Sequence, residues 1–216
     1  MIIDRGGSRS FPGPHAVREA AERAADIALL IGDDAGGALA QIPAPAAMHA
    51  IVVELGSECL GVHTGENAGS EGSNAVGFAR FRLGDDPPSD LVELVRQPRT
   101  EEAAIAAATQ LFTDAGLQVA LCNDFAGRMI DRLVRPYYND ALRRLDEGLA
   151  TAADLDLTLR LGLGYPVGPI ALLQRSGLDH HFDVTQALYE YTGDPAYAAA
   201  RRARVAKERQ RRNGGD

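Results

Sequence analysis

The stretch "AGRMIDRLVRPYYNDALRRLDEGLATAADLDLTLRLGLGYPVGPIALLQRSGLD" (residues 126–179) decides the fold of the second half of this chain. In its first part apolar residues recur at helical spacing, which predicts one amphipathic helix to about Glu147, ended by Gly148. The helix carries an acid, Asp131, at the edge of its apolar face. Asp131 can pair with Arg135 one turn on, and an exposed pair of this spacing contributes about 0.3–0.5 kcal/mol.

The rest of this stretch predicts more helices. Thr151 is expected to cap a second helix, with Asp154 as the acid of a shortened capping box. The segment 162–169 breaks that helix, and Pro169 suits the first turn of the next one. Further helices are predicted over residues 170–177, 181–193 and 195–210. The second half is therefore expected to be all-helical.

Up to about residue 122 the pattern is different. Short runs rich in Val, Ile and Leu, bounded by Gly, Pro or Asp, alternate with helical segments, which predicts a parallel α/β layer. The predicted strands are 25–32, 50–55, 75–81, 91–95 and 117–121. Helices are predicted over 14–24 and 100–116, with Thr100 as the N-cap of the second, and the glycine-rich segment 61–77 is predicted to be a loop.

Composition limits the partners and the compartment. The 216 residues carry a net charge of −8, which does not favour nucleic acid or an anionic membrane, although the run 201–212 is basic. We interpret that run as a solvated helix end; contact with phosphates is the alternative. The two cysteines lack disulfide or metal spacing, no apolar run is long enough to span a bilayer, and a cytoplasmic location is expected.

A family resemblance rests on several motifs at continuous spacing. They are Gly127, "RL..PY.N.A" (132–141), "EG.AT..D.D" (147–156), "G.GYP.GP" (162–169) and "GLD" (177–179). Residues 126–179 resemble the C-terminal helical domain of the 3-hydroxyacyl-CoA dehydrogenases. The segments 91–100 and 116–124 also look like the end of that family's nucleotide-binding domain, and the likeness is faint before residue 75.

The resemblance implies a fold and an activity. The expected fold is α/β followed by all-α: a truncated Rossmann-like parallel sheet domain at 1–122 and a helical dehydrogenase domain at 123–216. The implied activity is NAD-dependent oxidation of a 3-hydroxyacyl-CoA to the 3-ketoacyl-CoA in fatty-acid metabolism. We expect a homodimer through the C-terminal helices, with acyl-CoA as a possible ligand.

The family's catalytic residues are only partly matched. Glu93 falls where the family's glutamate orients a histidine base, but the histidine's place is taken by Arg80 or, with one residue of slack, Phe81. The family's serine maps onto Glu58 or Cys59, and its substrate-binding asparagine maps onto Asp131. Three of these four polar roles have therefore changed residue type.

The cofactor motif is also missing. A dinucleotide fingerprint needs GxGxxG between a strand and a helix. The glycine clusters at 5–14 and 32–38 do not match it, and the two acids of "GDDAGG" would repel a diphosphate. Two functional hypotheses follow: a dehydrogenase of this family with impaired catalysis, or a non-catalytic dimerisation or acyl-CoA-binding module, such as the second copy of a tandem enzyme.

Other candidate residues have alternative interpretations. Arg80 either binds a CoA phosphate or is a sheet-end arginine paired with an acid, while Glu93 is either a catalytic relic or a carboxylate neutralised by Arg80. Cys59 is interpreted as a buried inert thiol. His63 either replaces the missing base or is an exposed loop residue, and the adjacent His180 and His181 lack metal-ligand spacing.

Overall fold

The computed structural model describes residues 1–214 and divides into two compact units. The first unit contains Met1–Arg82 and Pro88–Met129. The second contains Leu83–Pro87 and the residues from Ile130 onward. Within residues 1–214 we find no helix that is both long and apolar enough to cross a membrane.

The first unit is built on a six-stranded sheet whose strands lie side by side in sequence order. The strands are β1 (Ile2–Asp4), β2 (Ile27–Ile31), β3 (Ala50–Glu54), β4 (Ala75–Arg80), β5 (Leu91–Arg96) and β6 (Gln118–Asn123). Neighbouring strands are parallel except β4 and β5, which are antiparallel. The predicted α/β layer is therefore confirmed, with one reversal that the sequence pattern did not predict.

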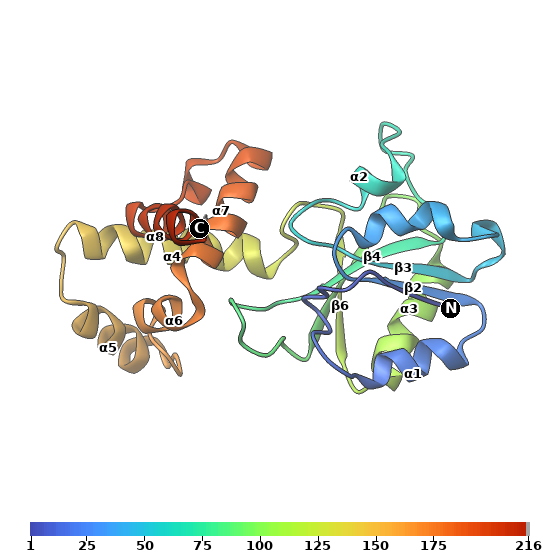
Figure 1. Cartoon of the computed structure of the whole chain (residues 1–216), viewed down its shortest axis with the longest axis horizontal. Helices are drawn as coiled ribbons and strands as arrows, with labels where there is room; N and C mark the ends of the chain where they lie inside the picture. Colours follow the sequence, from blue (N-terminus) through green and yellow to red (C-terminus); the bar gives the residue numbers. More distant parts are fainter. Residues whose placement is uncertain (215–216) are drawn as a thin grey trace. The chain divides into compact units, whose positions relative to one another are not determined.

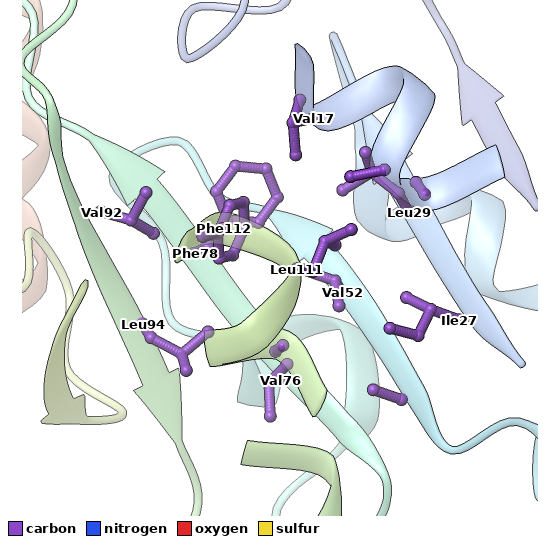
Figure 2. Packing of buried hydrophobic residues seen from close by; sticks show 14 of the residues in the cluster. Val17, Ile27, Leu29, Val52, Val76, Phe78, Val92, Leu94, Leu111 and Phe112 are labelled. Carbon is purple, nitrogen blue, oxygen red and sulfur yellow. The ribbon is translucent and has the colours of Figure 1, made fainter. Parts of the chain in front are cut away.

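Both faces of the sheet are covered, as its continuous apolar strands require. Helices α1 (Ala16–Arg23) and α3 (Glu102–Asp114) lie on one side of the sheet, and α2 (Gly61–Thr64) lies on the other (Figure 1). Under α1 and α3, Phe78 packs against Phe112 with ring centroids 5.0 Å apart (Figure 2). The 3₁₀ helix η1 (Ala35–Gln41) packs on the opposite face, against Leu30 and Val53.

The first two crossovers lie on opposite faces of the sheet. Helix α1 joins β1 to β2 on the face that carries Leu29 and Val52, whereas η1 joins β2 to β3 on the face of Leu30 and Val53. Both crossovers step in the same direction across parallel strands. Two such crossovers have opposite hands, so one of them departs from the right-handed rule for parallel connections.

The second unit is helical, as predicted. Its helices are α4 (Ile130–Asp146), α5 (Ala152–Leu163), α6 (Pro169–Ser176), α7 (Leu178–Thr192) and α8 (Arg201–Asn213), with a 3₁₀ turn η3 (Pro195–Tyr197). The Thr151 side chain accepts the Asp154 N–H and caps α5, and Pro169 occupies the first turn of α6. Gly148 adopts φ +73° after α4, a conformation that suits glycine.

Some local predictions were wrong. Helix α3 begins at Glu102, because the Thr100 hydroxyl accepts the Gln97 N–H at 2.8 Å and closes the preceding turn instead of capping the helix. The three-residue strand β1 and the 3₁₀ helix η1 were not predicted, since such short elements carry no clear period. The glycine-rich segment 61–77 begins with the short helix α2 before it becomes a loop.

Candidate functional site

A cavity of about 290 Å³ lies at the carboxyl ends of β1, β2 and β3. Open α/β sheets bind their ligands at this end of the strands. The loops after all three strands contribute to its wall, together with helix α2. The lining residues are Gly7, Arg9, Gly32, Asp33, Asp34, Ala35, Glu54, Leu55, Gly56, Glu58 and His63.

Glu54, the last residue of β3, joins the loops after the other two strands. One carboxylate oxygen accepts the Ser10 N–H at 2.7 Å, and the other accepts the Gly32 N–H at 2.8 Å. Glu54 is 6% exposed. Two backbone donors that point toward the strand ends are thus already bonded to a carboxylate of the same chain.

His63 and Glu58 form a pair in the cavity wall. His63 Nε2 lies 3.3 Å from Glu58 Oε1, and its side chain is only 13% exposed, so the interpretation of His63 as an exposed loop residue was wrong. A glycine makes room for each partner. A Cβ on Gly36 would lie 2.1 Å from the His63 ring, and one on Gly56 would lie 2.6 Å from Glu58 Oε2.

The residues of this cavity do not fit the diphosphate of NAD, the cofactor that the resemblance implies. Asp33, Asp34, Glu54 and Glu58 line it, and Arg9 is its one lining arginine. Carboxylates repel phosphates, and the Glu54 carboxylate already uses the two backbone donors. Dinucleotides bind such sheets at the point where the order of the strands changes direction across the sheet. Within residues 1–214 the strands follow one another in sequence order, so there is no such point.

Arg80, at the predicted base position, is a structural anchor. Its guanidinium donates to the carbonyls of Ser89 at 2.7 Å, Ser10 at 2.8 Å and Pro88 at 3.3 Å. It also lies 3.6 Å from the carboxylate of Asp90, which agrees with a sheet-end arginine paired with an acid. Burial lowers the pKa of Arg80, but a guanidinium still keeps its proton at neutral pH.

Glu93 lies on the other face of the sheet from Arg80. In the β4–β5 register Glu93 is opposite Ala79, and side chains alternate between faces along a strand. Arg80 is therefore not placed to neutralise Glu93. Phe81 follows the end of β4, and its ring carries no acid–base group. Glu93 itself is buried and accepts the Met129 N–H at 2.7 Å.

The positions that resemble the family's serine carry no activated nucleophile. Cys59 is half-buried, and desolvation followed by the charge of Asp124 raises its pKa. A thiol with a raised pKa forms little thiolate, which agrees with the interpretation of Cys59 as inert. At the alternative position, the Glu58 carboxylate accepts the Gly56 N–H and lies within hydrogen-bond distance of the His63 ring. No metal-binding group of His, Cys, Asp and Glu occurs within residues 1–214.

Asp131 belongs to the helical unit and begins a buried polar network. Its carboxylate accepts Arg135 Nε at 2.7 Å, and Arg135 Nη1 lies 3.1 Å from His181 Nδ1. His181 Nε2 lies 3.0 Å from the Asn139 carbonyl oxygen, while the Asn139 amide donates to Thr185 at 2.7 Å. These contacts assign the His181 proton to Nε2, so Nδ1 is the acceptor for Arg135.

Sequence reasoning missed Arg128. This residue is buried, adopts φ +50°, and donates through Nη2 to the Gly56 carbonyl. Its Nε and Nη1 atoms have no hydrogen-bond partner among the described residues. Arg128 directly follows Gly127 of the family motif, but neither its charge nor its spacing in the sequence indicates burial.

Comparisons with known proteins match the helical part of the chain most clearly. The sequence model described as "3-hydroxyacyl-CoA dehydrogenase, C-terminal domain" matches residues 127–216. A 3-hydroxybutyryl-CoA dehydrogenase of Mycobacterium tuberculosis is 39% identical over 113 residues, which cover 51% of this chain and 39% of that protein. The corresponding enzyme of Bradyrhizobium diazoefficiens is 33% identical over 111 residues, 51% of this chain and 38% of that protein.

Solved structures extend the likeness to the sheet unit. The crystal structure of FadB2 from M. tuberculosis has a TM-score of 0.68 at 23% identity, covering 90% of this chain and 68% of that one. The (S)-3-hydroxybutyryl-CoA dehydrogenase of Ralstonia eutropha has a TM-score of 0.66 at 23% identity, covering 86% and 66%. At this identity the two structures support the fold alone.

Together, the sheet and the helical unit define a class of two-part proteins in which an α/β domain precedes a helical domain. Within that class, residues 127–216 of this chain belong to the C-terminal domain family of the 3-hydroxyacyl-CoA dehydrogenases. In sequence, the chain spans about two fifths of the length of the curated relatives described above.

Proposed function

We propose that this chain is a member of the 3-hydroxyacyl-CoA dehydrogenase family in which NAD-dependent oxidation is impaired. The chemistry at the expected base position carries the proposal. Arg80 holds its proton and donates to three backbone carbonyls, and the neighbouring Phe81 has no titratable group. Neither residue can accept the proton of a 3-hydroxyl group, although a general base is needed to remove it.

Two further observations support the proposal. The cavity at the strand ends is acidic and does not suit a diphosphate. Asp131 stands where the resemblance expects a neutral amide, and its carboxylate is bonded to Arg135. An ionised carboxylate only accepts hydrogen bonds, so Asp131 cannot donate one to a substrate oxygen as the amide of an asparagine would.

The direct test is turnover. The purified chain is mixed with acetoacetyl-CoA and NADH, and the absorbance of NADH is followed. We expect no consumption above the rate without protein. The 3-hydroxybutyryl-CoA dehydrogenase of M. tuberculosis, measured in the same mixture, is the positive control. Steady consumption in proportion to the concentration of this chain would overturn the proposal of impaired catalysis.

We further propose that the helical unit pairs with a second copy of the chain. Helix α5 has no buried residue, yet it exposes Leu157, Leu161 and Leu163, with Leu161 77% exposed. A group of exposed leucines on one element is typical of a protein contact. Light scattering should therefore give the mass of a dimer. Leu161→Glu should give monomer, whereas Val62→Glu, at an exposed apolar residue of the sheet unit, should leave the dimer intact.

A groove in the helical unit favours a second candidate function, the binding of acyl-CoA without catalysis. The groove has a volume of about 230 Å³. Leu142, Leu145, Ile170, Leu178, Val205 and Ala206 form its apolar part, and Arg201, Arg202 and Arg209 line it as well. Apolar side chains suit an acyl chain, and arginines suit phosphates. The chain would have this role as the second copy in a tandem enzyme whose first copy catalyses the reaction.

Calorimetry with acetoacetyl-CoA tests this second candidate. We expect heat of binding that Arg209→Glu abolishes, because Arg209 lines the groove. Arg160→Glu, on α5 and not among the groove residues, is the matched control and should bind as the parent chain does. Absence of binding by the parent chain would exclude the acyl-CoA-binding module.

A further inference from the structure

We propose that Glu54 acts as a built-in anion, which fills an oxyanion-binding site formed by the backbone of the chain itself. The site consists of the Ser10 N–H, in the loop after β1, and the Gly32 N–H, directly after β2. The two Glu54 carboxylate oxygens accept one donor each, at 2.7 and 2.8 Å. Without Glu54, the same two donors would bind a phosphate or carboxylate group, because either group presents two oxygens to them.

The two donors need an acceptor from somewhere. Ser10 is 1% exposed, so bulk water does not reach this part of the loop. A buried backbone N–H without an acceptor is costly, and nearly all such groups in proteins are paired. Glu54 supplies the acceptor from a distant part of the sequence, 44 residues from Ser10 and 22 residues from Gly32.

Glu54 also faces the place where a ligand would enter. It lines the cavity of about 290 Å³ at the strand ends, together with Gly32. Removing the carboxylate would therefore enlarge this cavity beside the Gly32 N–H and free both donors of their acceptor. With Glu54 in place, the cavity holds four carboxylates in its wall, and an external anion meets both an occupied site and a repulsive charge.

This inference deepens the proposed loss of dehydrogenase chemistry, because it gives a physical reason why a diphosphate does not bind. It can nevertheless fail separately. The turnover of NADH tests the lost chemistry, whereas the inference about Glu54 is tested by anion binding and stability. A chain without turnover that also shows no latent anion site would retain the first proposal and overturn the second.

The experiment compares the thermal unfolding midpoint, Tm, of the parent chain and Glu54→Ala in chloride, acetate, phosphate and pyrophosphate at equal ionic strength. In chloride we expect Glu54→Ala to have the lower Tm. Acetate or phosphate should raise the Tm of Glu54→Ala by about 2–4 °C more than that of the parent chain. Acetate acting alone would assign the site to carboxylates, and phosphate or pyrophosphate acting alone would assign it to phosphates.

Asp34→Ala is the matched control. Asp34 lines the same cavity, but its side chain caps no backbone N–H of η1. The variant removes one negative charge without freeing the two donors, so anions should shift its Tm no more than they shift that of the parent chain. If anions stabilise Asp34→Ala and Glu54→Ala equally, the effect is one of charge alone and the inference is overturned.

Glu54→Gln covers the case in which Glu54→Ala does not fold in chloride. Folding of Glu54→Ala only in acetate or phosphate would support the inference. If that variant folds in none of the salts, Glu54→Gln decides, because its amide keeps the shape of the side chain but turns an NH₂ group toward one donor. A larger Tm rise in phosphate or acetate for Glu54→Gln than for the parent chain supports the inference, and equal rises overturn it.

Discussion

Asp131 and Arg135 form an ion pair one turn apart on helix α4, with Oδ1 and Nε 2.7 Å apart and side chains only 16% and 3% exposed. A second pair with the same spacing, Asp140 and Arg144, lies on the same helix at 3.1 Å but is about half exposed. The two pairs are alike in sequence and differ in solvent access. Helix α4 thus allows the effect of burial on an ion pair to be measured within one element.

Asp131→Asn should destabilise the helical unit. The substitution replaces the carboxylate that bonds to the buried Arg135 with a neutral amide, and removal of one charge of a buried pair is expected to lower the free energy of unfolding by about 1–3 kcal/mol. Asp140→Asn is the control and should change it by less than about 0.5 kcal/mol, because exposed pairs contribute little. Urea unfolding measures both. Equal effects would contradict the assigned role of burial.

His181 should make stability depend on pH. Burial, and secondly the charge of Arg135, lower its pKa to about 3 in the folded chain from 6.5. Between these values the unfolded chain binds the proton and the folded chain does not. Stability from this group is therefore complete above the unfolded pKa and is lost as the pH falls from 6.5 toward 3.

The comparison of two histidine variants checks this pH dependence. In urea unfolding at a series of pH values across that window, His181→Gln should show a shallower loss of stability than the parent chain. His180→Gln, at the adjacent half-buried position, should retain the parent slope. A parent-like slope for His181→Gln would assign the pH dependence to other groups.

Arg80→Met should destabilise the sheet unit. The variant leaves the carbonyls of Ser10, Pro88 and Ser89 without the guanidinium that bonds to them, and we expect a loss of about 2–4 kcal/mol. Asp90→Asn should have an effect below about 0.5 kcal/mol, because the Asp90 side chain is 91% exposed. An Asp90→Asn effect as large as that of Arg80→Met would identify the ion pair as the main stabilising contact.

Gly36→Ala should destabilise the cavity wall, because the new Cβ would lie 2.1 Å from the His63 ring. Overpacking of this kind costs about 1–3 kcal/mol. His63→Ala should relieve the clash, so that Gly36→Ala has little effect in that background. Gly162→Ala, where a Cβ meets nothing within 4 Å, is the control and should not destabilise α5. Additive effects of Gly36→Ala and His63→Ala would contradict the packing shown here.

Local signals predicted much of the fold. Helices α4 to α8 were predicted because helical spacing, the Thr151 cap and Pro169 act within a few residues of one another. Strands β2 to β6 were predicted from short apolar runs between turn residues. The reversal of β5 was not, because parallel and antiparallel buried strands share the same apolar pattern.

Candidate residues were found by resemblance, but their surroundings were not. Strand register places Arg80 and Glu93 on opposite faces of the sheet, and this register cannot be deduced from the two segments separately. The Glu54 contacts join the end of β3 to two loops across long sequence separations, and the burial of Arg128 depends on packing around a segment with an ordinary helical pattern.

The sequence by itself determined the family of the helical domain, the succession of a sheet and helices, and the pairing of Asp131 with Arg135. An i, i+4 pair follows from helix geometry alone. Only the tertiary structure decided that this pair is buried and leads to His181, that Glu54 binds two distant loops, and that Arg80 is an anchor. Solvent access and long-range hydrogen bonds set the energies of these charges, and both arise from packing between segments that are far apart in the chain.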